Sequence, residues 1–191
     1  MNNSLYSFKR LKKLANKLER GSDYTPCHSE NVANYARDLC SALNIRGKKK
    51  DMIITACLIH DIGKIGIDTQ LLIKKGKLKD SEWLKIKMHP ALSAILAKEA
   101  NLSKGVVETI YYHHVWFNGN GYPQANKKGT RIPIGARIMA VCDAYETMTS
   151  KRSYKDKRFS KEAALEELRR YSATQFDPSI VEAFVNFVRR G

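Results

Sequence analysis

The feature that most constrains the fold is the spacing of apolar residues, which recur every three or four positions along most of the chain. Residues 5–20 show it first, with Leu5, Phe8, Leu11 and Leu18 on one face. This is the period of an amphipathic α-helix, and no stretch alternates with the period of a β-strand. Further helices are expected at 26–43, 50–60, 81–88, 90–100, 103–114, 134–150, 160–171 and 177–190. The sequence therefore predicts an all-α fold, a single-domain bundle of seven or more helices.

Local signals set the expected ends of several helices. Gly63 and Gly66 should interrupt the chain after the apolar helix 50–60, and 68–79 is polar and irregular. Near the other end, Asp177 is a predicted N-cap and Pro178 occupies the first turn of the last helix.

Composition excludes several classes of protein. With 191 residues, 43% of them hydrophobic, the chain can bury a core, which excludes a disordered or fibrous protein. No apolar run approaches the roughly 20 residues that span a bilayer, and the N-terminus lacks the apolar core of an export signal. The four cysteines show no CxxC spacing, as expected in a reducing compartment. We expect a cytoplasmic protein with no membrane partner, in which an N-terminal helix, 1–20, packs on a domain formed by 21–191.

The charge is strongly basic, since 34 Lys and Arg face 19 Asp and Glu, for a net charge of +15. Such a surface attracts polyanions, including nucleic acid, nucleotides and anionic lipid, but a solvated surface without a specific partner fits the charge equally well. Charge alone does not decide between these readings.

The candidate chemistry lies in histidines and carboxylates. Asp61 follows His60 at the end of the most apolar helix, and Asp143 lies inside another apolar helix, so each carboxylate needs a compensating cation. His113 and His114 are adjacent, at the start of the glycine- and proline-rich stretch 115–133. Imidazole and carboxylate together are ligands of zinc, iron, manganese and similar ions. A metal site is therefore expected, and loops as long as 115–133 are often functional.

A carboxylate can bridge two ions, whereas an imidazole cannot, and paired ions suit displacement at phosphorus. Lys64 follows His60 by four residues and would share its face if the helix continued. By spacing alone, however, Lys64 is better interpreted as one of many surface lysines.

Several motifs in order resemble one known family. Residues 60–66, HDIGKIG, resemble the HD signature of metal-dependent phosphohydrolases. Residues 113–123, HHVWFNGNGYP, are similar to the HHExxDGxGYP stretch of the HD-GYP family, and segments 132–155 and 175–178 also fit. The resemblance covers about 20–190 and implies a helical HD-domain fold.

Members of that family hydrolyse the phosphodiester bonds of cyclic di-GMP, a bacterial second messenger. The resemblance implies a catalytic pair, Asp61 and Lys64, in which Asp61 bridges two ions and Lys64 contacts a phosphate oxygen, while a hydroxide between the ions attacks phosphorus. The first ion would be held by His28, His60, Asp61 and Asp143, and the second by His89, His113 and His114. Substrate contacts would come from Lys64, Gly119, Gly121, Tyr122, Pro123, Arg152 and Lys155. For the last two, a solvated charge run at 151–158 is the alternative.

The expected cofactor is two divalent ions per chain, iron or manganese before zinc, nickel or magnesium. Tyr24 stands where some members carry a Glu that supports a third ion, one helical turn before His28, and a phenol is a poor ligand at neutral pH. Asp23 and Glu30 would point away from the site on the expected helix. The cluster should therefore stop at two ions.

Three positions depart from the family pattern. Val115 replaces the usual Glu, Asn118 replaces the usual Asp, and Glu146 stands where Asp is usual. The first two changes should alter the hydrogen bonding of the signature loop and remove carboxylates that could orient a histidine ligand.

Three functions remain in competition. The first is a cyclic di-GMP phosphodiesterase that releases linear dinucleotide, GMP or both. The second is a catalytically weak module that binds metal and either a cyclic dinucleotide or a partner protein at the GYP loop. The third is an HD hydrolase of another nucleotide or nucleic acid, which the net charge supports but the GYP loop opposes, since other HD branches lack that loop.

Overall fold

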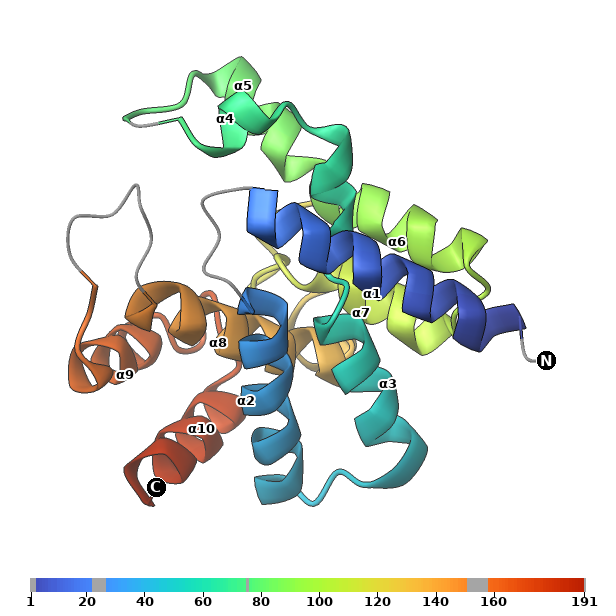
Figure 1. Ribbon diagram of the computed structural model, residues 1–191. Coiled ribbons are helices and arrows are strands. Elements are labelled where there is room, and N and C mark those ends of the chain that lie inside the picture. Colours follow the sequence, from blue (N-terminus) through green and yellow to red (C-terminus); the bar gives the residue numbers. More distant parts are fainter. Residues whose placement is uncertain (1–2, 22–26, 75, 151–157, 191) are drawn as a thin grey trace.

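The computed structural model describes residues 3–21, 27–74, 76–150 and 158–190, and within them the chain is helical (Figure 1). The α-helices are α1 (Asn3–Gly21), α2 (His28–Ala42), α3 (Gly47–Cys57), α4 (Thr69–Leu72), α5 (Asp80–Lys87), α6 (His89–Glu99), α7 (Lys104–Tyr112), α8 (Ile134–Thr149), α9 (Lys161–Arg170) and α10 (Pro178–Arg190). Two short 3-10 helices, η1 (Ile62–Gly66) and η2 (Gly129–Arg131), join them. The only β-type pairings in the described residues are two isolated bridges. The predicted all-α fold is confirmed.

The main difference from the expected elements lies after α3. That helix begins and ends three residues earlier than predicted, so His60 and Asp61 lie in a turn beyond it. Residues 62–66 form η1, where the two glycines had predicted only a break, and part of the segment 68–79 forms α4. A Cβ atom on Gly63 would lie 2.4 Å from the carbonyl oxygen of His89, so glycine allows η1 to approach α6.

The core lies where α2, α3 and α8 meet, and α7 and α10 pack against them. Its fully buried side chains include Leu39, Ile53, Ile138 and Phe184. Burying each such side chain contributes roughly 1.5–3 kcal/mol, so this core sets the positions of the helix ends around it. At the start of α10, the Asp177 carboxylate accepts the Ser179 amide hydrogen at 2.9 Å, which confirms the predicted N-cap.

Helix α1 crosses in front of the other helices in Figure 1 and packs against η1. Its own residues Leu11 and Ala15 are buried in this contact with the rest of the domain. The buried Glu19 carboxylate accepts hydrogen bonds from the Ser29 amide, at 2.9 Å, and from the Ser29 hydroxyl. This contact ties the end of α1 to the first turn of α2.

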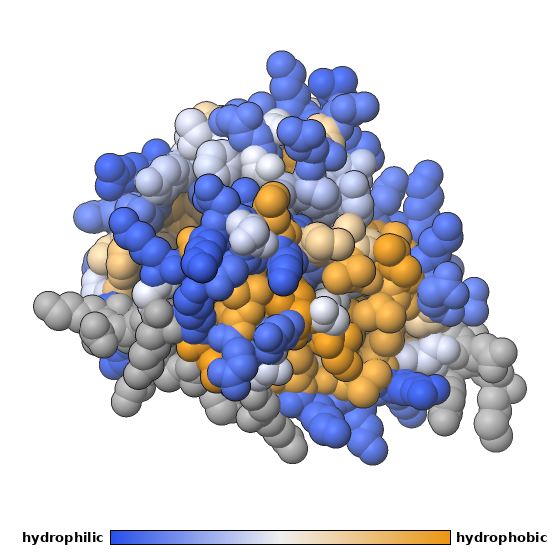
Figure 2. Space-filling view, turned by 90° about the horizontal axis from the view of Figure 1, so that it is seen from above, coloured by the Kyte–Doolittle hydropathy of each residue, from blue (hydrophilic) through white to orange (hydrophobic). Residues whose placement is uncertain are grey.

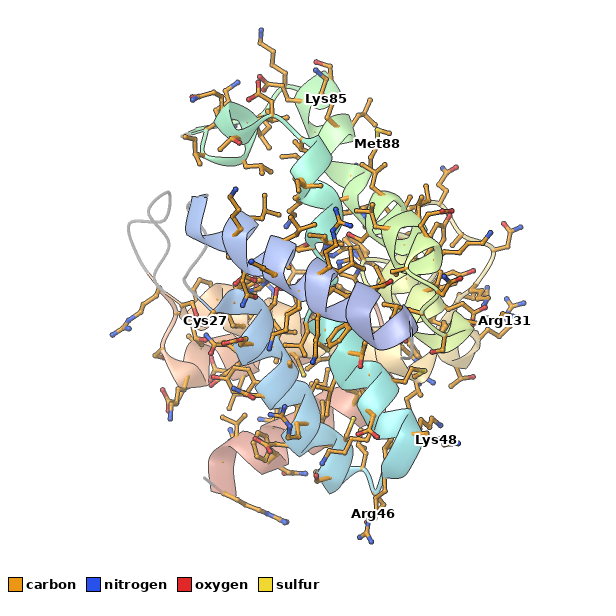
Figure 3. All side chains as sticks on the ribbon, turned by 45° about the vertical axis from the view of Figure 1, so that its right-hand side comes forward. Cys27, Arg46, Lys48, Lys85, Met88 and Arg131 are labelled. Carbon is orange, nitrogen blue, oxygen red and sulfur yellow. The ribbon has the colours of Figure 1, made fainter. Side chains whose placement is uncertain are left out.

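Helices α4 and α5 form an arm at the upper end of the molecule in Figure 1. We call residues 69–74 and 76–87 the α4–α5 arm. Neither of its helices has a buried residue. Lys85 and Met88 project from this end in Figure 3. Seen from above, the surface has an apolar area bordered by hydrophilic side chains (Figure 2). Among the described helices, none combines the length and apolar character that crossing a bilayer requires.

Candidate metal centre

The predicted ligands converge at the ends of separate helices. His28 is the first residue of α2, and His89 is the first residue of α6. His113 and His114 follow α7, while Asp143 lies inside α8. We call the group the His/Asp cluster, and its members are His28, His60, Asp61, His89, His113, His114 and Asp143. Every histidine of the sequence is in it, as the resemblance implied.

The ligand atoms of the cluster lie in overlapping groups. Within each group the atoms are all less than 4.8 Å apart. The groups are His28, His60 and Asp143; His89, His113 and His114; and His60, Asp61 and His113. The first two correspond to the two predicted ion sites, apart from the bridging aspartate.

Asp61 lies between these two groups. Its Oδ1 atom is 3.1 Å from Nε2 of His89, on one side. Its Oδ2 atom is 3.5 Å from Nε2 of His60 and 3.9 Å from Nε2 of His28, on the other. Each carboxylate oxygen therefore faces a different group, which is the geometry that a bridging ligand needs.

Backbone carbonyls fix the orientation of three of the rings. In each case Nδ1 meets the carbonyl oxygen of the residue three positions earlier, at 2.8 Å for His60, 2.8 Å for His89 and 2.5 Å for His113. Because a carbonyl only accepts, Nδ1 carries the hydrogen and Nε2 presents a lone pair. Nε2 of His60 is buried and has no hydrogen-bond partner among the described residues. An unsatisfied buried nitrogen of this kind fits a metal ligand.

His28 is oriented by a different partner, Glu146. Its Nδ1 atom donates to the Glu146 carboxylate, and its Nε2 atom is 3.2 Å from Oδ1 of Asp143. Ser150 donates to the other Glu146 oxygen at 2.7 Å. The sequence had marked Glu146 only as a mild departure from the family, and its role in holding His28 was missed. The available signal was a second acid, three residues after Asp143, on an apolar helix.

The electrostatics of the cluster favour a bound cation. Burial lowers the pKa of His28, but the hydrogen bonds to Asp143 and Glu146 outweigh it and raise this pKa to about 9. Burial also lowers the pKa of His114 to about 3 and that of His113 well below its usual value. Those two imidazoles are therefore neutral at physiological pH and can offer lone pairs. Asp143 and Glu146 stabilise positive charge beside His28, on the side of the cluster away from His113 and His114.

Lys64 reaches the cluster without the continuous helix that its spacing had suggested. It lies in η1, and its ammonium group donates a 2.6 Å hydrogen bond to Oδ2 of Asp61. The side chain is buried, with 8% of the residue exposed. The interpretation of Lys64 as a surface lysine is therefore wrong. This cation lowers the pKa of Asp61, against the opposing effect of burial.

The signature loop folds back over the cluster. The Tyr122 amide donates to the carbonyl oxygen of His114 at 3.1 Å, and the Tyr122 ring lies 4.7 Å from that imidazole. Gly121 has a φ of 87°, and a Cβ atom there would lie 2.2 Å from the carbonyl oxygen of His114. Pro123 follows Tyr122 through a cis peptide bond. Gly119 also has a positive φ, of 96°.

The two unusual residues of this loop have structural roles of their own. Val115 is buried with Ile132 and Ala136. The Asn118 side-chain oxygen accepts the Asn120 amide hydrogen at 3.0 Å, closing a turn as an aspartate would. His60, His89 and His113 are oriented by backbone carbonyls and not by residues 115 or 118. The absence of carboxylates at positions 115 and 118 therefore leaves the orientation of these three rings unchanged.

Some predicted residues lie outside the described part of the chain. These include Arg152 and Lys155, predicted to bind substrate, as well as Asp23 and Tyr24. The argument about a third ion assumed that His28 sits within a helix that began at 26. Instead α2 begins at His28, and Cys27 before it has a left-handed backbone with φ 73°. The expectation that Tyr24 supports no third ion stays a prediction, because Tyr24 lies outside the described residues.

A cavity of about 360 Å³ opens beside the cluster, between its ligands and the α4–α5 arm. A second cavity of about 310 Å³ lies beyond it, toward the α9–α10 turn, and shares His114, Asp143 and Thr147 with the first. The site thus combines a buried set of metal-type ligands, a buried lysine and an open cavity for a substrate.

Fold and site together define an all-α domain that holds a buried cluster of metal-type ligands beside an open cavity. The HD domain family matches residues 8–180 of this sequence. The chain therefore belongs to the HD domain family, and the resemblance found in its sequence is confirmed.

The curated relatives are longer bacterial proteins. The chain is 34% identical to a 3'3'-cGAMP-specific phosphodiesterase of Vibrio cholerae, over 88% of this chain and 32% of the relative. It is 33% identical to a cyclic di-GMP phosphodiesterase of Pseudomonas aeruginosa, over 90% of this chain and 41% of the relative. The chain thus spans well under half the length of these relatives. Among solved structures, a cyclic GMP-AMP-specific phosphodiesterase of V. cholerae superposes with a TM-score of 0.73 at 18% identity, covering 95% of this chain and 48% of that one. This likeness supports the fold alone.

Proposed function

We propose that this chain is a phosphodiesterase that hydrolyses cyclic di-GMP to the linear dinucleotide, GMP or both. One observation carries the proposal. The Asp61 carboxylate lies between two groups of buried ligand atoms, beside a buried lysine and an open cavity. Relatives named as cyclic di-GMP and cGAMP phosphodiesterases supply the class of substrate.

The residues present fit two divalent ions. His28, His60, Asp61 and Asp143 would hold the first, and His89, His113 and His114 the second, with Asp61 shared. Iron or manganese is our first choice, before zinc, nickel or magnesium, since imidazole and carboxylate suit several of these metals. When bound, such ions supply an acidified water and neutralise charge on the phosphate.

The protein contributes orientation and charge. Backbone carbonyls and Glu146 set the tautomers of four imidazoles, so that Nε2 of each faces the cluster. Lys64 is close enough to hold Asp61 and to meet a phosphate oxygen at the same time. The Tyr122 ring packs against the His114 imidazole and supports its position. We also propose that the loop with Gly119, Gly121 and Pro123 shapes the substrate site.

The cytoplasm is the proposed location, supported by the free cysteines, three of which are buried thiols. A nucleic-acid substrate is less well supported. The signature loop, which other HD branches lack, favours a cyclic dinucleotide instead. In Figure 3, Arg46 and Lys48 project from the lower end of the molecule, and Lys85 projects from the upper end. A partner protein docking at the signature loop is the alternative use of the same site.

The test begins with anaerobic purification and metal analysis. The protein is then assayed with Mn²⁺ or Fe²⁺ against cyclic di-GMP, 3'3'-cGAMP and a single-stranded oligonucleotide, and products are separated by chromatography. We expect about two ions per chain and hydrolysis of cyclic di-GMP. Bound metal without turnover of any cyclic dinucleotide would favour the binding module, and cleavage of the oligonucleotide alone would favour another HD hydrolase.

A further inference from the structure

The cavity beside the cluster has two unlike sides. One side carries the ligands and Lys64, which the proposed hydrolysis uses. The other side comes from the α4–α5 arm and is mostly apolar, with Leu71, Leu72, Leu78, Trp83 and Ile86 beside Gly76 and the charged Lys74. Cleavage of a phosphodiester bond does not require an apolar wall. The wall therefore has to be explained by another part of the ligand.

Trp83 is the largest side chain of this wall, and 40% of the residue is exposed. Its ring makes an edge contact with Tyr122, with centroids 6.2 Å apart and planes at 72°. The Lys87 ammonium lies 5.7 Å from the Trp83 centroid and 5.8 Å from that of Tyr122. Trp83 thus presents an aromatic surface to the cavity, with a cation beside it.

The aromatic pair is fixed relative to the cluster. Tyr122 packs on His114, and its centroid is 6.2 Å from that of His89. Helix α5, which carries Trp83, ends at Lys87, and α6 begins with His89 after a single intervening residue. The Trp83 ring therefore has a fixed position relative to the ligand His89.

The arm itself is held by polar contacts. Lys74 donates to both Glu82 carboxylate oxygens, at 2.8 and 2.7 Å, and the Lys79 amide donates to Glu82 at 2.7 Å. Asp68 accepts the Gln70 amide hydrogen at 2.9 Å and caps α4. The bonds to Glu82 tie residues 74 and 79 to α5, and Asp68 fixes the start of α4, so polar contacts rather than a buried core hold this wall.

We propose that Trp83, with the apolar wall beside it, stacks on one nucleobase of the substrate. A flat apolar group next to a phosphodiester is what this cavity can accept, and a nucleobase is that group. Base–aromatic stacking is worth about 1–3 kcal/mol per base and tolerates any base, because each has a π-face. The inference rests on the proposed function for the identity of the substrate. It adds a base-binding subsite that the cluster and signature loop do not provide.

Two substitutions separate stacking from simple packing. Trp83→Ala removes the ring and should raise KM for cyclic di-GMP by roughly 5- to 150-fold, with a smaller change in kcat. Trp83→Phe retains an aromatic face and should stay close to wild type. Leu84→Ala is the matched control, because Leu84 is the next residue of α5, is 62% exposed and does not line the cavity.

Fluorescence provides a readout that is independent of turnover. The chain has two tryptophans, Trp83 and Trp116. In stopped-flow mixing of the metal-loaded protein with cyclic di-GMP, stacking should quench Trp83 before hydrolysis. The quenching should fall in Trp83→Phe although binding persists, and inorganic phosphate, which has no base, should not cause it.

The outcomes distinguish this proposal from the proposed function. Quenching by cyclic di-GMP that depends on Trp83, without turnover, would support the base subsite and overturn the phosphodiesterase. Turnover with an unchanged KM in Trp83→Ala and unchanged quenching in Trp83→Phe would overturn the base subsite alone. Neither binding nor turnover of cyclic di-GMP would overturn both.

Discussion

The two sides of the main cavity are built in opposite ways. The His/Asp cluster lies on helix ends that surround the core, and His28, His60, His89 and His113 are each at most 1% exposed. The α4–α5 arm has no buried residue in either helix and is held by a surface ion pair and turns. The core therefore fixes the positions of the candidate metal ligands, whereas the proposed recognition of a base depends on the exposed α4–α5 arm. Changes in the cluster should abolish the reaction, and changes in the arm should adjust affinity.

The largest effect is expected at the centre of the cluster. Asp61→Ala removes the one carboxylate that faces both ligand groups, and with it the ion pair to the buried Lys64 cation. We predict loss of bound metal and a fall in turnover greater than the roughly 10- to 100-fold typical of outer partners of a metal ligand. Metal analysis and kinetics measure it. Lys64→Met is the matched variant, expected to keep its metal and lose turnover. An Asp61→Ala protein with its full metal content would contradict the site assignment.

A smaller effect is expected at Glu146, which contacts the candidate ligand His28. Glu146→Ala frees the Nδ1 side of His28, and we predict a loss of roughly 10- to 100-fold in metal affinity or activity. Glu146→Gln can still accept the hydrogen bond and should lose less. Titration of the metal-free protein measures the affinity, and Glu166→Ala, an exposed acid on α9, serves as the control. Equal affinities for all these proteins would show that the core does not orient His28 through Glu146.

A third prediction concerns the stability of the core side as pH changes. Burial would raise the pKa of Asp177, but hydrogen bonds from Ser179 and Arg137 lower it below its usual value. The stabilisation is therefore complete above the unfolded pKa of about 3.9 and is lost as pH falls through the lower folded value. At pH 7, Asp177→Asn should cost about 1.5 kcal/mol in free energy of unfolding.

Denaturant unfolding with a chelator present measures this cost without contributions from bound metal. The difference between wild type and Asp177→Asn should shrink toward zero below the folded pKa of Asp177. A difference that stays constant down to the lowest pH would show that the carboxylate charge contributes nothing to this contact.

The smallest effect is expected in the arm. Lys74→Ala removes the ion pair with Glu82, which lies at the surface and is screened by salt. We predict a thermal midpoint close to that of wild type and a modest rise in KM for cyclic di-GMP, with kcat unchanged. The rise in KM should diminish at high salt. Lys104→Ala is the control, because Lys104 is an exposed lysine on α7. A large fall in kcat would mean that the arm takes part in the chemistry.

Local sequence determined the helices and indicated the candidate ligand set. Apolar spacing located each long helix because amphipathic faces form from residues three and four apart. Burial of Asp61 and Asp143 pointed to a cation because an isolated buried charge is costly. Helix ends were less certain, since α3 stops at Cys57, and the last predicted residue, His60, lies in the turn that places its ring in the cluster.

Only the tertiary structure decided how distant residues complete the site. Glu146 holds His28 across 118 positions of sequence, and no local pattern encodes that contact. Trp83 is an exposed residue on a short helix, and only the packing of distant segments places it on the cavity, beside Tyr122 of the signature loop. Spacing along one helix specifies a face, but packing between helices decides what that face meets.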